Sequence, residues 1–261
     1  MTRSTLLVLT LFLASALVQS PIFGQCGGQG WPGPFRQPVR RDRINAFSSD
    51  PGIHTDQHHT YDKYDHGHAN QLHPNLNIHL LPLGDSITYG FTSSDGNGYR
   101  SILHDLLQTG NTLDFIGSTK SGTMLDNDNK GHIAAIIEQI AQSATNPLAL
   151  PARPNVVLLM AGTNDLLDGL NSTAPAALSA LLDTIFTTCP DAALLVATLT
   201  PLPSTPAGVV DAFNLVRAQM VQARQAAGQH ILLASMASFT ATDLIDGIHP
   251  TDAGYVKMAN V

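Results

Sequence analysis

From residue 77 onward, short apolar runs alternate with segments of helical spacing, and this alternation constrains the fold most. The apolar runs lie at residues 77–83, 112–117, 155–160, 192–199 and 231–234. The helical segments occupy residues 99–107, 133–141, 175–188, about 207–227 and a last stretch capped by Thr251. Runs that are apolar on both faces are typical of parallel strands covered by helices on each side. The pattern therefore predicts an α/β fold, a three-layer α/β/α sandwich with a five-stranded parallel, flavodoxin-like sheet.

The N-terminal region carries an export signal rather than a folding pattern. Arg3 precedes a largely apolar run, Leu6–Val18, which is shorter than the roughly 20 residues that span a bilayer but matches a signal-peptide core. Ala14-Ser15-Ala16 supplies a cleavage signal of the small-x-small type. We assign residues 1–20 to a signal peptide, 21–76 to a linker and 77–261 to the folded domain. We thus expect a secreted, extracellular protein without a membrane partner, and glycosylation at Asn171 in the sequon Asn-Ser-Thr.

The linker is rich in proline, glycine and histidine and lacks sustained apolar periodicity. Its start, Gln25–Pro34, resembles the first strand and turn of the small fungal cellulose-binding module, although that module relies on several cysteines. We interpret the stretch as a remnant or an error in the gene model. Seven of the eleven histidines lie between His54 and His79, but their spacing matches no defined zinc motif. We interpret them as a polar segment that becomes cationic below about pH 6.5, with no metal site.

Composition excludes several classes of partner and scaffold. The formal net charge is −7, with 13 Lys and Arg against 20 Asp and Glu, so a nucleic-acid partner is not expected. Cys26 and Cys189, the two cysteines, are too few for a disulfide scaffold or a four-thiolate zinc site. Whether they pair is open from the sequence. Nineteen of the 20 acids are aspartates, so chemistry that needs a carboxylate would use aspartate.

Two of three turn-like motifs follow predicted strands, at the edge where parallel sheets bind ligands. In Gly84-Asp85-Ser86, a serine at a strand-to-helix turn exposes its hydroxyl for attack and its N–H for an oxyanion. In Gly162-Thr163-Asn164-Asp165, the asparagine amide can donate a hydrogen bond to the same oxyanion. Each motif alone also fits an ordinary turn, because Gly, Asn and Asp favour turns.

The third motif, Asp246-Gly247-Ile248-His249-Pro250, precedes the last predicted helix. Asp246 three residues before His249 can hold the imidazole and leave Nε2 free as a general base. Together the three motifs supply a nucleophile, an oxyanion donor, a base and an orienting carboxylate. We therefore expect nucleophilic acyl chemistry with Ser86, His249 and Asp246.

With these motifs, residues 77–261 resemble the SGNH (GDSL-type) hydrolase superfamily. The residues that flank the motifs resemble those of carbohydrate esterase family 3, the secreted acetylxylan esterases. The resemblance is carried by Leu81–Gly90 (LPLGDSITYG), Asp95–Arg100 (DGNGYR) and Asp114–Ser118 (DFIGS), beside the second and third motifs. It implies Ser86 as nucleophile, His249 as base, Asp246 as its orienter, and no cofactor. Gly84, Asp85, Gly162 and Asp165 are then supporting motif positions.

The same resemblance implies an oxyanion hole formed by Ser86, Asn164 and the backbone N–H of the last glycine in a Glu-Gly-His-x-Gly motif. Here the aligned stretch is Lys130-Gly131-His132-Ile133-Ala134, so Ala134 stands at the glycine position. A backbone donor survives this change only if the local φ is negative. Gly131 or Gly122 are alternative donors if the alignment is shifted. The closing helix is short, about ten residues, and we expect it to be truncated.

The function that the resemblance implies is hydrolysis of acetyl esters on a plant-cell-wall polysaccharide such as acetylated xylan. We expect the protein to be a monomer. Two alternatives stay open. One is a short-chain esterase or lipase of the same fold. The other is a catalytically impaired, secreted carbohydrate-binding paralogue, prompted by Ala134, the incomplete N-terminal module and the short last helix.

Overall fold

The computed structural model describes residues 75–261. The expected signal peptide, the cellulose-binding-module-like start, Cys26 and the histidines from His54 to His73 lie outside the described residues.

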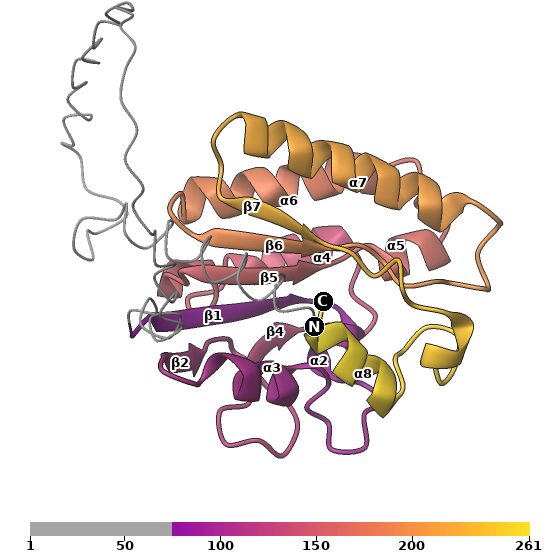
Figure 1. Cartoon of the computed structure of the whole chain (residues 1–261). Helices are drawn as coiled ribbons and strands as arrows, with labels where there is room; N and C mark the ends of the chain where they lie inside the picture. Colours follow the sequence, from indigo (N-terminus) through magenta and orange to yellow (C-terminus); the bar gives the residue numbers. More distant parts are fainter. Residues whose placement is uncertain (1–74) are drawn as a thin grey trace, which may run out of the picture. The chain divides into compact units, whose positions relative to one another are not determined.

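A mainly parallel sheet forms the middle layer of the domain (Figure 1). Its strands are β1 (Asn77–Gly84), β2 (Thr112–Phe115), β3 (Thr119–Lys120), β4 (Asp128–Gly131), β5 (Val156–Met160), β6 (Ala193–Ala197) and β7 (Ile231–Ala234). The order is β3-β4-β1-β5-β6-β7, and β2 pairs with the first half of β1. All neighbours are parallel except β3 and β4.

The predicted three-layer α/β/α architecture is confirmed, but the sheet has seven strands rather than five. The five predicted strands correspond to β1, β2, β5, β6 and β7 in flavodoxin-like order. The additional strands are β3 and β4, which extend the edge beyond the end of β2. Their sequences contain no apolar run, because β4 reads Asp-Asn-Lys-Gly, so hydrophobic periodicity could not reveal them.

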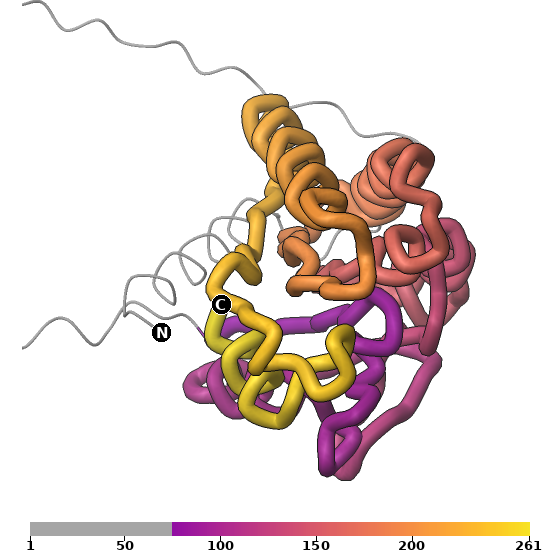
Figure 2. The backbone as a smooth tube through the Cα atoms, turned by 90° about the vertical axis from the view of Figure 1, so that its right-hand side faces the viewer, coloured from indigo at the N-terminus to yellow at the C-terminus, as the bar shows by residue number. Residues whose placement is uncertain are grey.

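Helices cover both faces of the sheet. One layer contains α4 (Ile137–Ala144), α6 (Ala174–Thr188) and α7 (Val209–Ala226), and α6 lies against both α4 and α7 (Figures 1 and 2). The other contains α3 (Arg100–Leu107) and α8 (Asp252–Ala259), which contact each other. Side chains of β1 alternate accordingly: Leu81 and Leu83 pack into one hydrophobic cluster, Ile78 and Leu80 into another.

The helix predicted over residues 133–141 begins four residues later, at Ile137. The side chain of Asp165, in the short helix α5 (Thr163–Leu167), accepts a hydrogen bond of 2.9 Å from the Ile137 N–H and thereby caps α4. Ile133 and Ala134 lie instead in an exposed turn that links β4 to α4. The expected cap of the last helix is confirmed, because the Thr251 side chain accepts from the Gly254 N–H at 3.0 Å.

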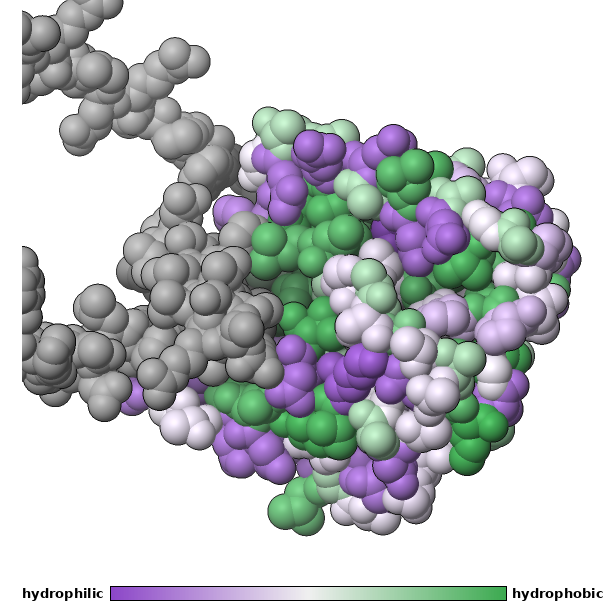
Figure 3. Space-filling view, turned by 45° about the vertical axis from the view of Figure 1, so that its right-hand side comes forward, coloured by the Kyte–Doolittle hydropathy of each residue, from purple (hydrophilic) through white to green (hydrophobic). Residues whose placement is uncertain are grey.

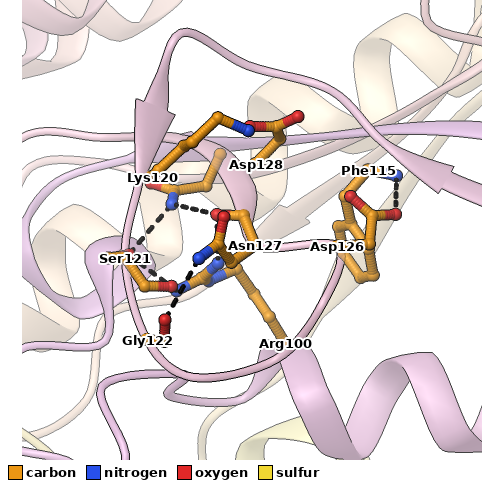
Figure 4. Close-up of polar contacts among 9 residues, drawn as sticks. Arg100, Phe115, Lys120, Ser121, Gly122, Asp126, Asn127 and Asp128 are labelled. Carbon is orange, nitrogen blue, oxygen red and sulfur yellow. Dashed lines mark hydrogen bonds and ion pairs between the residues drawn. The ribbon is translucent and has the colours of Figure 1, made fainter.

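A buried arginine holds together the loops beside the end of β1. Arg100 is fully buried and donates to the carbonyls of Tyr89, Ser121 and Asn127 (Figure 4 shows its neighbours Ser121, Gly122 and Asn127). The guanidinium offers five N–H donors in a rigid plane, against the three of a lysine ammonium, and can therefore bind carbonyls of several segments at once. Arg100 therefore fixes the C-terminal end of α2 (Ser86–Tyr89) against the loop between β3 and β4.

Candidate active site

Three side chains from two distant segments of the chain form a continuous hydrogen-bonded series. Ser86 Oγ lies 2.8 Å from His249 Nε2, and His249 Nδ1 lies 2.7 Å from Asp246 Oδ2. Because Nδ1 faces a carboxylate, the neutral imidazole carries its proton there, and Nε2 is left to accept from the serine hydroxyl. This arrangement can generate a serine nucleophile.

The nucleophile turn is compact because Gly84 has no side chain. A Cβ at this position would lie 2.3 Å from both the Met160 carbonyl oxygen and Thr88 Oγ1. Asp85 then caps α2 by accepting from the Ile87 N–H at 2.9 Å, so Ser86 is the first residue of that helix. Gly84 and Asp85 thus position Ser86 rather than contribute a reacting group.

The loop that carries His249 is organised by Asp246. Its Oδ1 accepts from the backbone N–H groups of Ile248 and His249, at 3.0 and 2.8 Å, while Oδ2 binds the imidazole. Partial burial works to raise the pKa of Asp246, but these hydrogen bonds together lower the pKa below its usual value. Asp246 therefore stays ionised and holds both the loop and the ring.

Asn164 follows β5 at the same edge of the sheet. Its Nδ2 donates one hydrogen bond of 2.9 Å to the Ala135 carbonyl, which identifies the amide nitrogen and fixes its plane. The second N–H of the amide remains for a ligand oxygen. Gly162 admits this turn, since a Cβ there would lie 2.5 Å from the Phe213 ring.

Ala134 occupies a conformation that glycine normally supplies. Its φ is +60°, in the left-handed region, so the condition of a negative φ that we set from the sequence is not met. That condition is wrong, because an alanine held at this φ keeps the backbone conformation that glycine would adopt, and its N–H stays available as a donor. The next residue is fixed on both sides, since the Ala135 carbonyl accepts from Asn164 Nδ2 and the Ala135 N–H donates to the His132 carbonyl at 3.2 Å. The surroundings impose the strained conformation.

Beneath Ser86 lies a set of buried charges that sequence reasoning missed in part. Burial raises the pKa of Asp85 to about 6 and also raises that of Asp165. Arg217 of α7, itself fully buried, donates to the carbonyls of Ala161 and Ala197, and burial lowers its pKa to about 9. Arg217 compensates both carboxylates and binds the ends of β5 and β6.

A signal for Arg217 was present in the sequence. It lies four residues after Phe213 and four before Val221, both buried, and therefore in the apolar stripe of α7. A basic residue in such a stripe indicates a buried partner.

The remaining predicted positions lie apart from this site. Asn171 is exposed in the turn before α6. Cys189 is a buried free thiol that donates to the Leu150 carbonyl, and burial raises its pKa to about 11. No group of three or more His, Cys, Asp or Glu side chains within residues 75–261 could hold a metal ion. No helix of that same region is long and apolar enough to cross a membrane.

Two curated proteins are similar to parts of this chain. "Putative endoglucanase X" of Acetivibrio thermocellus is 36% identical over 129 residues, which cover 48% of this chain and 55% of that protein. "Multidomain esterase" of Ruminococcus flavefaciens is 26% identical over 213 residues, covering 69% of this chain and 27% of that protein. The chain thus spans about half the length of the first relative and about a quarter of the second.

Solved structures share the fold over most of their length. A family 3 carbohydrate esterase of Clostridium thermocellum is 36% identical, with a TM-score of 0.63, and the match covers 70% of this chain and 92% of that one. A carbohydrate esterase family 3 structure from Talaromyces cellulolyticus, 24% identical with a TM-score of 0.59 and 71% and 93% coverage, shows the same fold.

The resemblance inferred from the motifs is confirmed by a family model. The model of the GDSL-like Lipase/Acylhydrolase family matches residues 83–257, a range that begins just before Gly84 and ends beyond His249. Because the match spans most of the folded domain and all three motifs, the chain belongs to the GDSL-like lipase/acylhydrolase family.

Proposed function

We propose that this protein is a serine esterase that removes acetyl groups from a plant-cell-wall polysaccharide such as acetylated xylan. The observation that carries the proposal is the hydrogen-bonded series from Ser86 through His249 to Asp246. The family 3 carbohydrate esterase of Clostridium thermocellum, 36% identical, supports a carbohydrate ester as substrate.

The first half of the proposed reaction forms an acyl-enzyme. His249 Nε2 takes the proton of Ser86 as Oγ attacks the acetyl carbonyl carbon, and the negative charge develops on the carbonyl oxygen. The free N–H of the Asn164 amide and the backbone N–H groups of Ser86 and Ala134 stabilise that oxygen. His249 then donates its proton to the sugar oxygen, the ester C–O bond breaks, and the sugar leaves as an alcohol.

The second half releases acetate. A water molecule gives a proton to His249 and attacks the acetyl carbon, and the bond to Ser86 Oγ breaks as His249 returns the proton to that oxygen. Asp246 stays ionised throughout and stabilises the imidazolium that forms twice in each turnover.

Acetate release from acetylated xylan by the purified full chain tests this function. We expect wild type to release acetate and Ser86→Ala to retain less than about one thousandth of the rate, since the nucleophile is lost. Ser172→Ala, which removes an exposed hydroxyl and preserves the sequon, serves as the matched control and should retain full activity. Activity of Ser86→Ala above a few per cent of wild type refutes Ser86 as nucleophile.

Two further measurements separate the alternatives. A lipase or general esterase would hydrolyse octanoyl esters or a triglyceride better than acetyl esters. A catalytically impaired carbohydrate-binding protein would release no acetate and would not react with a fluorophosphonate probe, which labels an activated serine. We expect labelling of wild type and none of Ser86→Ala.

We also propose that the chain is secreted. The support is the apolar run Leu6–Val18 with its Ala14-Ser15-Ala16 signal, together with the exposed position of the sequon residue Asn171. Expression in a eukaryotic secretion host should yield protein in the medium whose N-terminus begins after Ala16. Intracellular protein that retains Met1–Val18 would refute this assignment.

A further inference from the structure

Phe91 is an exposed aromatic side chain beside the site. Hydrophobic side chains reach the surface of the domain at several places among polar ones (Figure 3). Eight large ones are exposed within residues 75–261: Phe91, Leu125, Ile133, Leu148, Leu170, Leu215, Ile245 and Val256. Phe91, which is 42% exposed, is the one aromatic residue among them. Exposure of such a ring costs free energy, so a functional reason is expected when its position is also enforced.

The backbone around Phe91 is held on two sides. Its N–H donates to the Ser86 carbonyl at 3.0 Å, and its carbonyl accepts from the Tyr255 hydroxyl at 2.7 Å. The next residue, Thr92, donates from Oγ1 to the Pro250 carbonyl at 3.2 Å. The segment thus connects the nucleophile helix to the loop that carries His249. The backbone that carries the Phe91 ring is therefore held in place rather than part of a free loop.

Thr92 adopts a conformation that its side chain disfavours. Its φ is +70°, in the left-handed region, and a β-branched residue with positive φ is an outlier. Such strain persists where the surroundings over-determine the backbone, and it concentrates at functional sites. The hydrogen bonds of Phe91 and Thr92 supply that constraint here. The Phe91 ring is thus kept at the surface although its exposure to water and the left-handed φ of Thr92 both cost free energy.

The Phe91 ring contacts the imidazole that protonates the leaving group. The Phe91 and His249 ring centroids are 4.9 Å apart with an interplanar angle of 64°. In the proposed reaction, His249 Nε2 donates a proton to the oxygen of the departing alcohol, so that oxygen lies within about 3.2 Å of Nε2. A sugar ring attached to this oxygen is large enough to reach the neighbouring Phe91, whereas the acetyl group points towards Asn164 and Ser86.

We propose that Phe91 is a specificity-determining residue whose ring supports the sugar that carries the acetyl group, an inference that rests on the proposed function. A pyranose presents a face of C–H groups, and burial of such a face on an aromatic ring is favourable. An alcohol without a ring, such as ethanol, gains nothing comparable. Phe91 therefore favours acetylated sugars over simple alkyl acetates.

Competing substrates test the inference. We compare kcat/KM for an acetylated xylo-oligosaccharide with kcat/KM for ethyl acetate in wild type, Phe91→Ala, Phe91→Leu and Phe91→Tyr. The ratio of the two values should fall about tenfold in Phe91→Ala and Phe91→Leu, equivalent to about 1.4 kcal/mol, and should return close to wild type in Phe91→Tyr. Phe91→Leu retains bulk next to His249, so the ratio stays measurable if Phe91→Ala fails to fold.

The outcomes distinguish the two proposals. If both substrates lose activity equally, Phe91 acts only by positioning His249, and the inference is wrong. If the ratio is unchanged in all variants, the inference is also wrong, while the proposed function stands. If wild type hydrolyses ethyl acetate but no acetylated oligosaccharide, the proposed function itself is refuted, and the role of Phe91 falls with it.

Discussion

Replacement of Asp85 by asparagine should remove the loss of folding stability that ionisation of this buried carboxyl causes as the pH rises. Asp85 is fully buried, and burial raises its pKa from 3.8 to about 6, although the Ile87 N–H and Arg217 act in the opposite direction. Asparagine keeps an oxygen that can accept from the Ile87 N–H, so the cap of α2 can persist. The substitution therefore removes the titration while preserving the shape.

The direction of the pH effect on stability follows from how tightly the folded and the unfolded protein bind the Asp85 proton. A carboxyl whose pKa is higher in the folded state binds its proton more tightly there, so its contribution to stability is complete below pH 3.8 and is lost as pH rises through about 6. A difference of about two pH units corresponds to about 3 kcal/mol. The free energy of unfolding of Asp85→Asn, relative to wild type, should thus rise by about 3 kcal/mol between pH 3.5 and pH 7.

Urea unfolding at a series of pH values, followed by circular dichroism, measures this difference. Asp191→Asn is the matched control, because Asp191 lies exposed at the surface, and its stability relative to wild type should change far less over this range. A relative stability of Asp85→Asn that varies by less than about 1 kcal/mol over the range, or that falls with pH, would refute the assignment of a destabilising buried carboxylate.

Three further substitutions test the neighbouring groups. Asn164→Ala should lower kcat for acetate release by about 10²–10³, because one oxyanion donor is lost, and an unchanged kcat would exclude that role. Ala134→Gly should raise the free energy of unfolding in urea by up to about 1 kcal/mol by relieving the left-handed alanine, and a loss of stability would contradict the strain. Arg217→Met should lower the free energy of unfolding by about 3 kcal/mol, and hence the melting temperature in calorimetry by about 6–12 °C, because buried carbonyls and carboxylates lose their partner. A melting temperature within about 2 °C of wild type would show that Arg217 is dispensable.

Prediction from the sequence succeeded where local patterns decide the structure. β1, β5, β6 and β7 lie where the apolar runs are, within one or two residues at their ends. The cap at Thr251 follows from side-chain chemistry over three residues, which any fold that contains the helix would preserve. The position of Ser86 and Asn164 at one edge of the sheet also followed from the topology, because each follows a parallel strand and parallel strands end on the same side.

Prediction failed where distant groups decide the conformation. β4 has no apolar signal, yet its residues Asn129 and Lys130 are buried, where Lys130 pairs with Leu83 of β1 and Asn129 pairs with Thr119 of β3. The start of α4 is determined by a carboxylate 28 residues away, on Asp165. The left-handed φ of Ala134 was also beyond the sequence, since an alanine by itself favours negative φ.

The sequence by itself therefore determined the alternation of strands and helices, the family and the identity of the polar groups at the sheet edge. It did so because apolar spacing, turn residues and motif order are properties of short segments. Only the tertiary structure decided the strained turn at Ala134, the burial of Arg217 beside Asp85, and the contact of Phe91 with His249. Each of these joins segments far apart in the chain, and the energies that hold them come from burial and from hydrogen bonds that exist only once the sheet has assembled.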